Sequence, residues 1–172
     1  MDLIYKPILY LHIAVGFISL FIFWMPILTK KGRKAHRVWG RWYVRGMAVV
    51  VSTALLLSIL LVFKQDFGRA LFLALLSFLS GQATWAGYAV LNHKTERSGS
   101  YKNIDLTFNS ILFTLAIGLI ILFFTYMQIS VFLIFGIIGL IAGFQGINQY
   151  RKGTQQPWLL VHLSSLLFSG AA

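Results

Sequence analysis

Apolar runs long enough to cross a bilayer recur along the whole chain, and this feature constrains the fold more than any other. Crossing about 30 Å of hydrocarbon takes about 20 mainly apolar residues at about 1.5 Å each. Six runs approach this length, at about residues 7–29, 46–63, 70–91, 106–127, 131–147 and 157–172. Because a helix satisfies its backbone hydrogen bonds internally, the runs predict an all-α integral membrane bundle of about six transmembrane helices. This bundle forms a single domain over residues 1–172.

The composition excludes most classes of soluble protein. Hydrophobic residues make up 58% of the 172 residues and charged residues 11%, and there is no cysteine. Disulfides, thiolate zinc sites, iron–sulfur clusters and covalently attached haem are therefore excluded, and any metal or haem must use histidine or oxygen ligands. No nucleophile motif, phosphate-binding glycine loop or zincin signature occurs. A soluble-type hydrolase is not expected.

Positive charge is concentrated on one side of the predicted bundle. Of the fifteen Lys and Arg residues, twelve lie in the first, third and fifth connections, against Lys6, Lys64 and Arg69 on the other side. Cytoplasmic loops carry the excess of Lys and Arg, so the pattern predicts a cell-membrane protein with these connections in the cytoplasm and both termini outside. The first run leads directly into Lys30 and Lys31 without a cleavage site, which indicates a retained span rather than a signal peptide.

The basic segment after the first run predicts contact with anionic lipid. Its arginines recur every four residues and form one helical stripe, consisting of Arg33, Arg37, Arg41 and Arg45. His36, Trp39 and Tyr43 fall on nearly the opposite side of this interfacial amphipathic segment. The rings of Trp39 and Trp42 are expected at headgroup depth, and each arginine contributes about 1 kcal/mol beside anionic lipid. Nucleic acid is not an expected partner, because the segment has no separate fold; the alternative is a segment that only fixes the topology.

Ionisable side chains inside membrane spans are costly and usually mark a site. His12 lies about 9 Å below the outer boundary of the first span, on one face with Gly16 and Ser19. His162 lies about 8 Å from the inner boundary of the last span, on one face with Ser169. Both faces are expected to point at neighbouring helices.

An inner-side cluster is the leading candidate for a functional site. It combines His36, His93 at the end of the third span, Asp105 at the start of the fourth, and His162. Together with His12 in the outer half, these are the candidate cofactor-binding residues. We expect the cluster to bind a redox cofactor, either b-type haem or quinone, or to relay protons.

Other uses of the histidines stay open. A metal ion needs three or four ligands, but no pair has the i, i+3 or i, i+4 spacing that prebuilds a site, so no metal site is expected. Haem needs two histidines on facing helices at one depth, whereas His12 and His162 are about 13 Å apart along the membrane normal on these boundaries. His162 with His93 is another possible pair. The remaining alternative is that each histidine is hydrogen-bonded in helix packing.

Four glycines on the fifth run indicate close helix packing. Gly139 and Gly143, with Gly136 and Gly146 nearby, form a ridge of small residues. Such ridges let the backbones of two membrane helices approach closely. We therefore expect this run to pack tightly against a neighbour.

Several short motifs are spread along the chain. They are His12, Lys31-Gly32 followed by His36 and Gly40, Gly81, Ile104-Asp105, and Trp158-Leu159 before His162. The most specific piece is the run Lys-Gly-Arg-Lys-Ala-His-Arg-Val-Trp-Gly. Over most of the chain they resemble a domain-of-unknown-function family of small bacterial multi-pass membrane proteins. The resemblance implies the membrane fold and the importance of His12, His36, Asp105 and His162, without an activity. Members usually continue past the last histidine with a longer helix, so we expect the last helix here to be incomplete.

Two other classes of function compete with cofactor binding. A small-molecule or lipid permease of this size would need to oligomerise and show repeat symmetry, but residues 1–86 do not clearly match 87–172. A structural accessory subunit of a larger membrane complex would co-purify with a membrane-protein partner, and the small size favours this alternative. A homo-oligomer is equally compatible with the sequence.

Overall fold

The described part of the chain is helical, as predicted. A computed structural model describes residues 2–92, 100–126, 130–151 and 157–171. Its helices are α1 (Asp2–Leu28), α2 (Lys34–Phe63), α3 (Phe67–Ala89), α4 (Ser100–Tyr126), α5 (Ser130–Arg151) and α6 (Trp158–Ala171). No strand occurs among these residues. The prediction of an all-α membrane bundle is confirmed.

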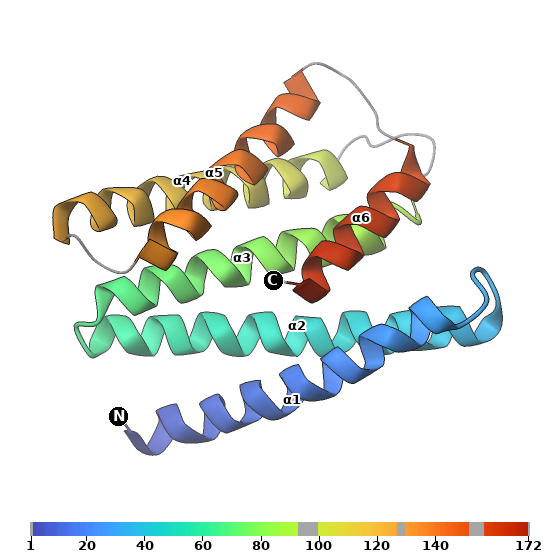
Figure 1. Ribbon diagram of the computed structural model, residues 1–172, viewed down its shortest axis with the longest axis horizontal. Helices are drawn as coiled ribbons and strands as arrows, with labels where there is room; N and C mark the ends of the chain where they lie inside the picture. Colours follow the sequence, from blue (N-terminus) through green and yellow to red (C-terminus); the bar gives the residue numbers. More distant parts are fainter. Residues whose placement is uncertain (1, 93–99, 127–129, 152–156, 172) are drawn as a thin grey trace.

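Five of the helices, α1 to α5, are long and apolar enough to cross a membrane. The sixth, α6, has 14 residues and reaches about 21 Å, which is less than the hydrocarbon thickness. The described structure therefore contains five helices of spanning length and one shorter apolar helix, in agreement with the short last run of the sequence. In Figure 1, α6 runs from one end of the bundle to its middle.

The basic segment is part of α2 and not a separate interfacial helix. We expected the second span to begin at Gly46, but α2 starts at Lys34 and continues through Gly46 without a break. Its 30 residues reach about 45 Å, so its first turns extend beyond about 30 Å of hydrocarbon. The helix persists because Gly46 packs against Ser19 of α1, and one glycine costs a helix only about 1 kcal/mol.

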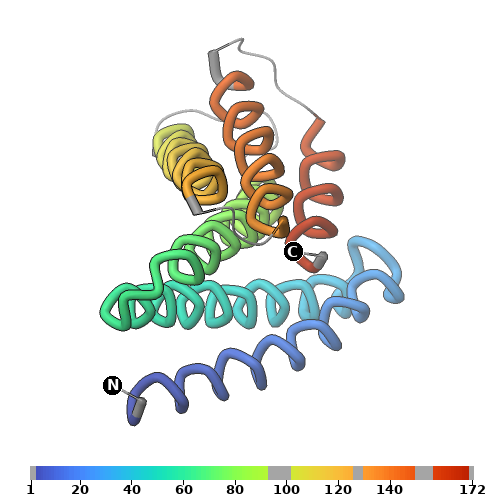
Figure 2. Tube along the Cα trace, turned by 60° about the vertical axis from the view of Figure 1, so that its left-hand side comes forward, coloured from blue at the N-terminus to red at the C-terminus, as the bar shows by residue number. Residues whose placement is uncertain are grey.

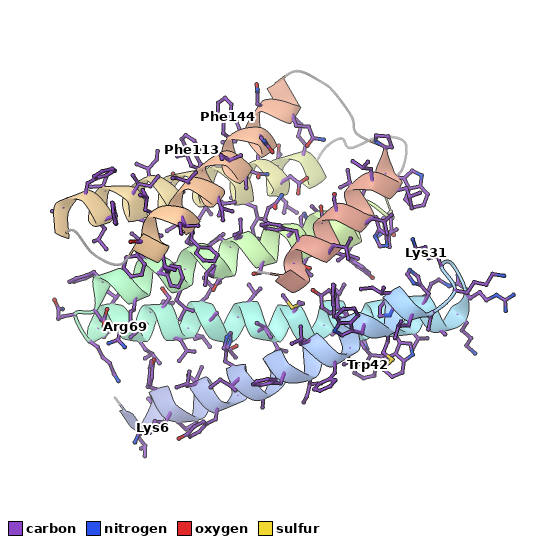
Figure 3. The ribbon with its side chains drawn as sticks, viewed as in Figure 1. Lys6, Lys31, Trp42, Arg69, Phe113 and Phe144 are labelled. Atoms are coloured by element: carbon purple, nitrogen blue, oxygen red, sulfur yellow. The ribbon has the colours of Figure 1, made fainter. Side chains whose placement is uncertain are left out.

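The helix α3 lies at the centre of the bundle. It packs on α2, α4, α5 and α6, while α1 packs on the other side of α2. Figures 1 and 2 show α1 and α2 as one layer and the α4–α5 pair on the far side of α3. The amino-terminal ends of α2, α4 and α6 all lie at the end of the molecule marked by Lys31 (Figure 3).

The tightest packing joins α4 to α5. A cluster of Leu75, Leu79, Leu112, Ala116, Leu119 and Phe132 fills the space between α3, α4 and α5. A Cβ atom at Gly143 would lie 2.9 Å from the backbone nitrogen of Phe113, and one at Gly139 would lie 2.9 Å from a methyl group of Leu75. The prediction of a close-packing glycine ridge is confirmed.

The outer faces of the helices are apolar. The helix α1 has only 6% of its most apolar window buried inside the protein. Phe17, Phe21 and Trp24 on this helix are 62%, 73% and 53% exposed. Large exposed apolar side chains on spanning helices face the hydrocarbon of a bilayer, and the protein is an integral membrane protein.

Candidate functional site

His36 binds the end of α1. Its Nδ1 lies 3.0 Å from the carbonyl oxygen of Pro26. The helix α1 ends at Leu28, so this carbonyl is among the last four, which have no partner within the helix. A histidine near a helix C-terminus satisfies such a carbonyl. The short loop between α1 and α2 thus brings His36 back onto the helix that precedes it.

His162 plays the same role at the end of α3. Its Nδ1 lies 2.7 Å from the carbonyl oxygen of Gly87, two residues before α3 ends at Ala89. Gly87 is buried, and a Cβ atom there would lie 2.8 Å from Leu166. The absence of a side chain at Gly87 therefore lets α6 approach closely enough for His162 to reach the backbone of α3.

His12 is held by the middle of α2. Its Nδ1 lies 3.1 Å from the carbonyl oxygen of Val50 and 3.0 Å from Oγ1 of Thr53. The Thr53 hydroxyl already donates to the carbonyls of Val49 and Val50, so its oxygen is free to accept. His12 lines a pocket together with Gly16 and Ser19, which confirms the predicted shared face.

The three described histidines have the same tautomer. A carbonyl oxygen only accepts hydrogen bonds, so Nδ1 of His12, His36 and His162 must carry the hydrogen. In the neutral ring, Nε2 then has a free lone pair. Histidines that bind metal are anchored in the same way, since the ring nitrogen that does not coordinate donates to a carbonyl or carboxylate.

A hydrogen bond between α2 and α6 allows the positions of His36 and His162 along the bundle to be compared. The hydroxyl groups of Tyr43 and Ser169 are 2.8 Å apart. His36 precedes Tyr43 by seven residues and His162 precedes Ser169 by seven residues. Seven residues are about two turns, or about 10 Å, so each histidine shares a helix face with its contact residue. Both histidines therefore lie on the Lys31 side of this contact (Figures 1 and 3).

The remaining members of the predicted cluster lie elsewhere. His12 contacts residues of α2 beyond Tyr43, on the opposite side of the α2–α6 contact from His162. Asp105 is 4% exposed on α4, which packs mainly on α5 and α3. His93 lies outside the described residues. Within the described ranges, no three His, Asp or Glu side chains gather as metal ligands, because α3 separates α4 from α2.

The buried polar group beside Asp105 has a packing role. The amide nitrogen of Asn109 donates to the backbone carbonyl of Asp105 at 2.7 Å. Asn109 is 2% exposed, and its side chain fills the space above Gly146 of α5. This part of the predicted inner cluster thus contributes to the α4–α5 interface.

A half-open pocket between helices is the feature that the sequence did not indicate. It has a volume of about 200 Å³ and lies between α1, α2, α3 and the end of α6. Its polar lining residues are His12, Ser19, Tyr43, Ser77, Ser80 and Ser169. The i, i+3 spacing of Ser77 and Ser80 places them on one face of α3. This spacing indicates a polar face on α3 from the sequence alone, but it does not show which helix the serines face.

The basic surface has the predicted arginine stripe. Arg33, Arg37, Arg41 and Arg45 are all exposed. The guanidinium carbon of Arg45 lies 5.4 Å from the centre of the Trp42 ring, a cation–π distance. Tyr43 is buried and His36 is half-buried as expected for the opposite face, whereas Trp39 is 38% exposed. Trp39 therefore lies at the border between the two faces.

Comparisons with known proteins add no relative. The chain matches no protein-family model, no curated protein and no solved structure. The resemblance to a family of small bacterial membrane proteins stays a prediction. The geometry of the residues therefore carries the functional argument.

Proposed function

We propose that the protein is an integral membrane component that binds b-type haem between α2 and α6, with His36 and His162 as axial ligands. The observation that carries this proposal is the matched placement of the two histidines. Each is seven residues from the Tyr43–Ser169 contact, and each has Nδ1 on a backbone carbonyl. Two histidines at a similar depth, each with Nδ1 engaged and Nε2 left for a ligand, suit a b-type haem.

The surroundings of the two histidines suit this role. A hydrogen bond from Nδ1 orients the ring and makes Nε2 a stronger ligand. With His36 and His162 both holding it, a bound haem would supply electron transfer. The pocket of about 200 Å³ between α1, α2, α3 and α6 is too small for a porphyrin, since a cavity of about 150 Å³ holds only benzene. This pocket is therefore not the proposed haem site.

Absorption spectra of matched variants test the haem proposal. We expect detergent-purified protein, expressed with added haem precursor, to show a Soret band that shifts on reduction with dithionite. His36→Gln and His162→Gln should each abolish this band, because glutamine can still donate to the Pro26 or Gly87 carbonyl but has no imidazole. His12→Gln makes the same chemical change on the other side of the α2–α6 contact and should retain the band.

Two results would overturn the haem proposal. One is a wild-type spectrum without a Soret band despite adequate haem supply. The other is a Soret band that persists in the double variant His36→Gln/His162→Gln. Either result would leave these histidines as caps of α1 and α3, and co-purification of a membrane-protein partner would then favour the accessory-subunit alternative.

We also propose that the arginine stripe faces the cytoplasm and binds anionic lipid. The stripe is exposed on the turns of α2 that extend beyond the hydrocarbon, and Trp42 beside Arg45 suits headgroup depth. The chain has no cysteine, so Lys31→Cys and Lys64→Cys can be labelled separately in intact cells with an impermeant maleimide. We expect only Lys64→Cys to react; labelling of Lys31→Cys alone would reverse the orientation.

The lipid preference has its own test. Lipids that co-purify with the wild type should include more anionic phospholipid than those of an Arg33→Gln/Arg37→Gln/Arg41→Gln variant. Equal lipid composition in the two samples would contradict the preference while leaving the orientation unaffected.

A further inference from the structure

We propose that the pocket between α1, α2, α3 and α6 holds the terminal part of one acyl chain from the surrounding bilayer. The pocket has a volume of about 200 Å³. A cavity of about 150 Å³ accommodates the carbon ring of benzene, so this pocket accommodates about eight chain carbons at the same density. The site uses neither the histidines proposed to bind haem nor the arginine stripe, and it goes beyond both proposals.

The pocket is continuous with the lipid-facing surface of the bundle. The helix α1 packs on α2 and has at most isolated contacts with α3 among the described residues, although all three helices line the pocket. The pocket is therefore a groove over α2 that stays open between α1 and α3. Its lining residue Leu20 belongs to the exposed apolar surface of α1, together with Phe17 and Phe21. Acyl chains surround this surface at hydrocarbon depth, so they reach the pocket directly.

The pocket is long and closed at the Lys31 end. A Cβ atom at Gly170 of α6 would lie 2.6 Å from the ring of Phe23, so α6 contacts α1 there. The Tyr43–Ser169 hydrogen bond joins α6 to α2 at the same end. From Phe23 the lining residues of α1 extend back to His12, which is a distance of about 16 Å along the helix. A narrow groove of this length suits an extended chain.

The hydroxyl groups along the pocket are already used within the protein. Ser77 donates to the carbonyl of Leu73, and Tyr43 and Ser169 share a hydrogen bond. The Oγ atom of Ser19 is covered by neighbouring atoms. A buried water needs two to four polar partners, and these groups leave few for it. The rest of the wall is mainly apolar and includes Leu20, Met47, Val50, Val51, Ala54 and Leu76.

Packing, and not the hydrophobic effect, favours the bound chain. Lipid chains are as apolar as leucine, so moving a chain from the bilayer into the pocket gains no hydrophobic energy. An empty pocket, however, leaves the atoms of its wall without van der Waals partners on one side. A flexible acyl chain restores these contacts. A side chain that fills the same space should therefore displace the lipid.

Photo-cross-linking in vesicles tests the site with the full-length protein. The probe is phosphatidylcholine with a diazirine near the methyl end of one acyl chain, mixed into phosphatidylcholine vesicles. We expect mass spectrometry to find the label on Met47, which lines the pocket and is only 8% exposed. Label on Phe21 reports ordinary contact with the bilayer and serves as the internal reference.

A pair of matched variants distinguishes the pocket from the rest of the lipid-facing surface. Gly16 lines the pocket, and a Cβ atom there would meet nothing within 4 Å. Gly16→Leu should thus retain the thermal unfolding temperature and lower the ratio of Met47 label to Phe21 label at least fivefold. Ala14→Leu makes a similar enlargement on the exposed side of α1 and should leave the ratio unchanged. An unlabelled Met47 in the wild type, or the same ratio in Gly16→Leu, would overturn the proposal.

A cysteine variant tests water as the alternative occupant and does not depend on how well Gly16→Leu folds. The chain has no cysteine, so Gly16→Cys provides a single thiol in the pocket. We expect this thiol to react with a charged, water-soluble methanethiosulfonate at least tenfold more slowly than that of Lys64→Cys. Equal rates would show a hydrated pocket and overturn the proposal. Neither measurement requires haem, so a failure of the haem proposal leaves both results interpretable.

Discussion

Small and polar residues have opposite roles on the two sides of α3. On the α4–α5 side, glycines bring two backbones together, and the Asn109 side chain fills the space above Gly146. On the α1–α2–α6 side, a Cβ atom at Gly16 would meet nothing within 4 Å, and the buried Ser19 hydroxyl has no hydrogen-bond partner among the described residues. A ridge of glycines thus marks close packing on one side of the bundle, whereas serine and histidine on the other side line a cavity. The same residue types stabilise one half by close packing and line a pocket in the other.

Enlarging a glycine should have opposite effects on the two sides, and this is the largest expected effect. Gly143→Leu would force its side chain against the backbone of Phe113 and Asn109, which cannot move aside as a flexible side chain would. We expect a loss of about 3 kcal/mol or more in stability. Gly16→Ala should leave the unfolding temperature in detergent unchanged or raise it. Equal losses in the two variants would show that the halves are packed alike.

Removing either partner of the Tyr43–Ser169 hydrogen bond should lower stability by a smaller amount, and the two substitutions should differ in their cost. Ser169→Ala leaves the buried Tyr43 hydroxyl without its partner, at a cost of about 1–3 kcal/mol. Tyr43→Phe should cost less, about 1 kcal/mol, because the Ser169 hydroxyl still donates to Leu166. Thermal unfolding of both variants shows which substitution lowers stability more. The reverse order would indicate that packing of the ring, and not the hydrogen bond, holds α6 on α2.

Alanine substitution of two buried serines, Ser58 and Ser19, provides a further comparison, in which the expected change in stability is smaller. The hydroxyl of Ser58 donates to the carbonyl of Ala70 at 2.7 Å, so Ser58→Ala should cost about 1 kcal/mol. Ser19→Ala removes a hydroxyl without a partner and should leave stability unchanged or raise it by up to about 1 kcal/mol. Unfolding temperatures of ligand-free protein give the result. A clear loss for Ser19→Ala would mean that its hydroxyl is already satisfied.

The turn between α2 and α3 lies outside both regions, and a substitution there should have the smallest effect on stability. Asp66 accepts a hydrogen bond from the backbone of Arg69 at the start of α3. The Arg69 side chain holds the pKa of Asp66 below its ordinary value. This stabilisation is present above about pH 4, the pKa of an unfolded Asp, and is lost as the pH falls through the lower folded pKa. Asp66→Asn should show a weaker pH dependence of unfolding than the wild type between pH 6 and 3, and equal profiles would contradict the role of Asp66.

Helix positions and faces were largely predictable from the sequence. The shared face of His12, Gly16 and Ser19, the ridge around Gly143 and the inward direction of Tyr43 follow from a period of 3.6 residues. The sequence did not show that the basic segment and the second span form one helix, α2, because the charged stretch was treated as a separate segment although a helix can continue into the headgroup region. The short α6 was predicted from the length of its apolar run.

The membership of the candidate site was not predictable in the same way. Asp105 was grouped with the histidines because its depth is similar, but α3 lies between α4 and α2. Ser77 and Ser80 were overlooked because small polar residues are common in membrane helices. Only the contact of α3 with α2 and α6 places these serines around a cavity.

The sequence by itself determined that the chain is a bundle of membrane helices, because apolar runs of this length can satisfy their backbone hydrogen bonds in lipid only as helices. It also determined which residues share each helix face. The tertiary structure alone decided which faces meet, and so paired His36 with α1, His162 with α3 and His12 with Thr53. The physical reason is that periodicity and depth are properties of one helix, whereas neighbours depend on how side chains of several helices pack together.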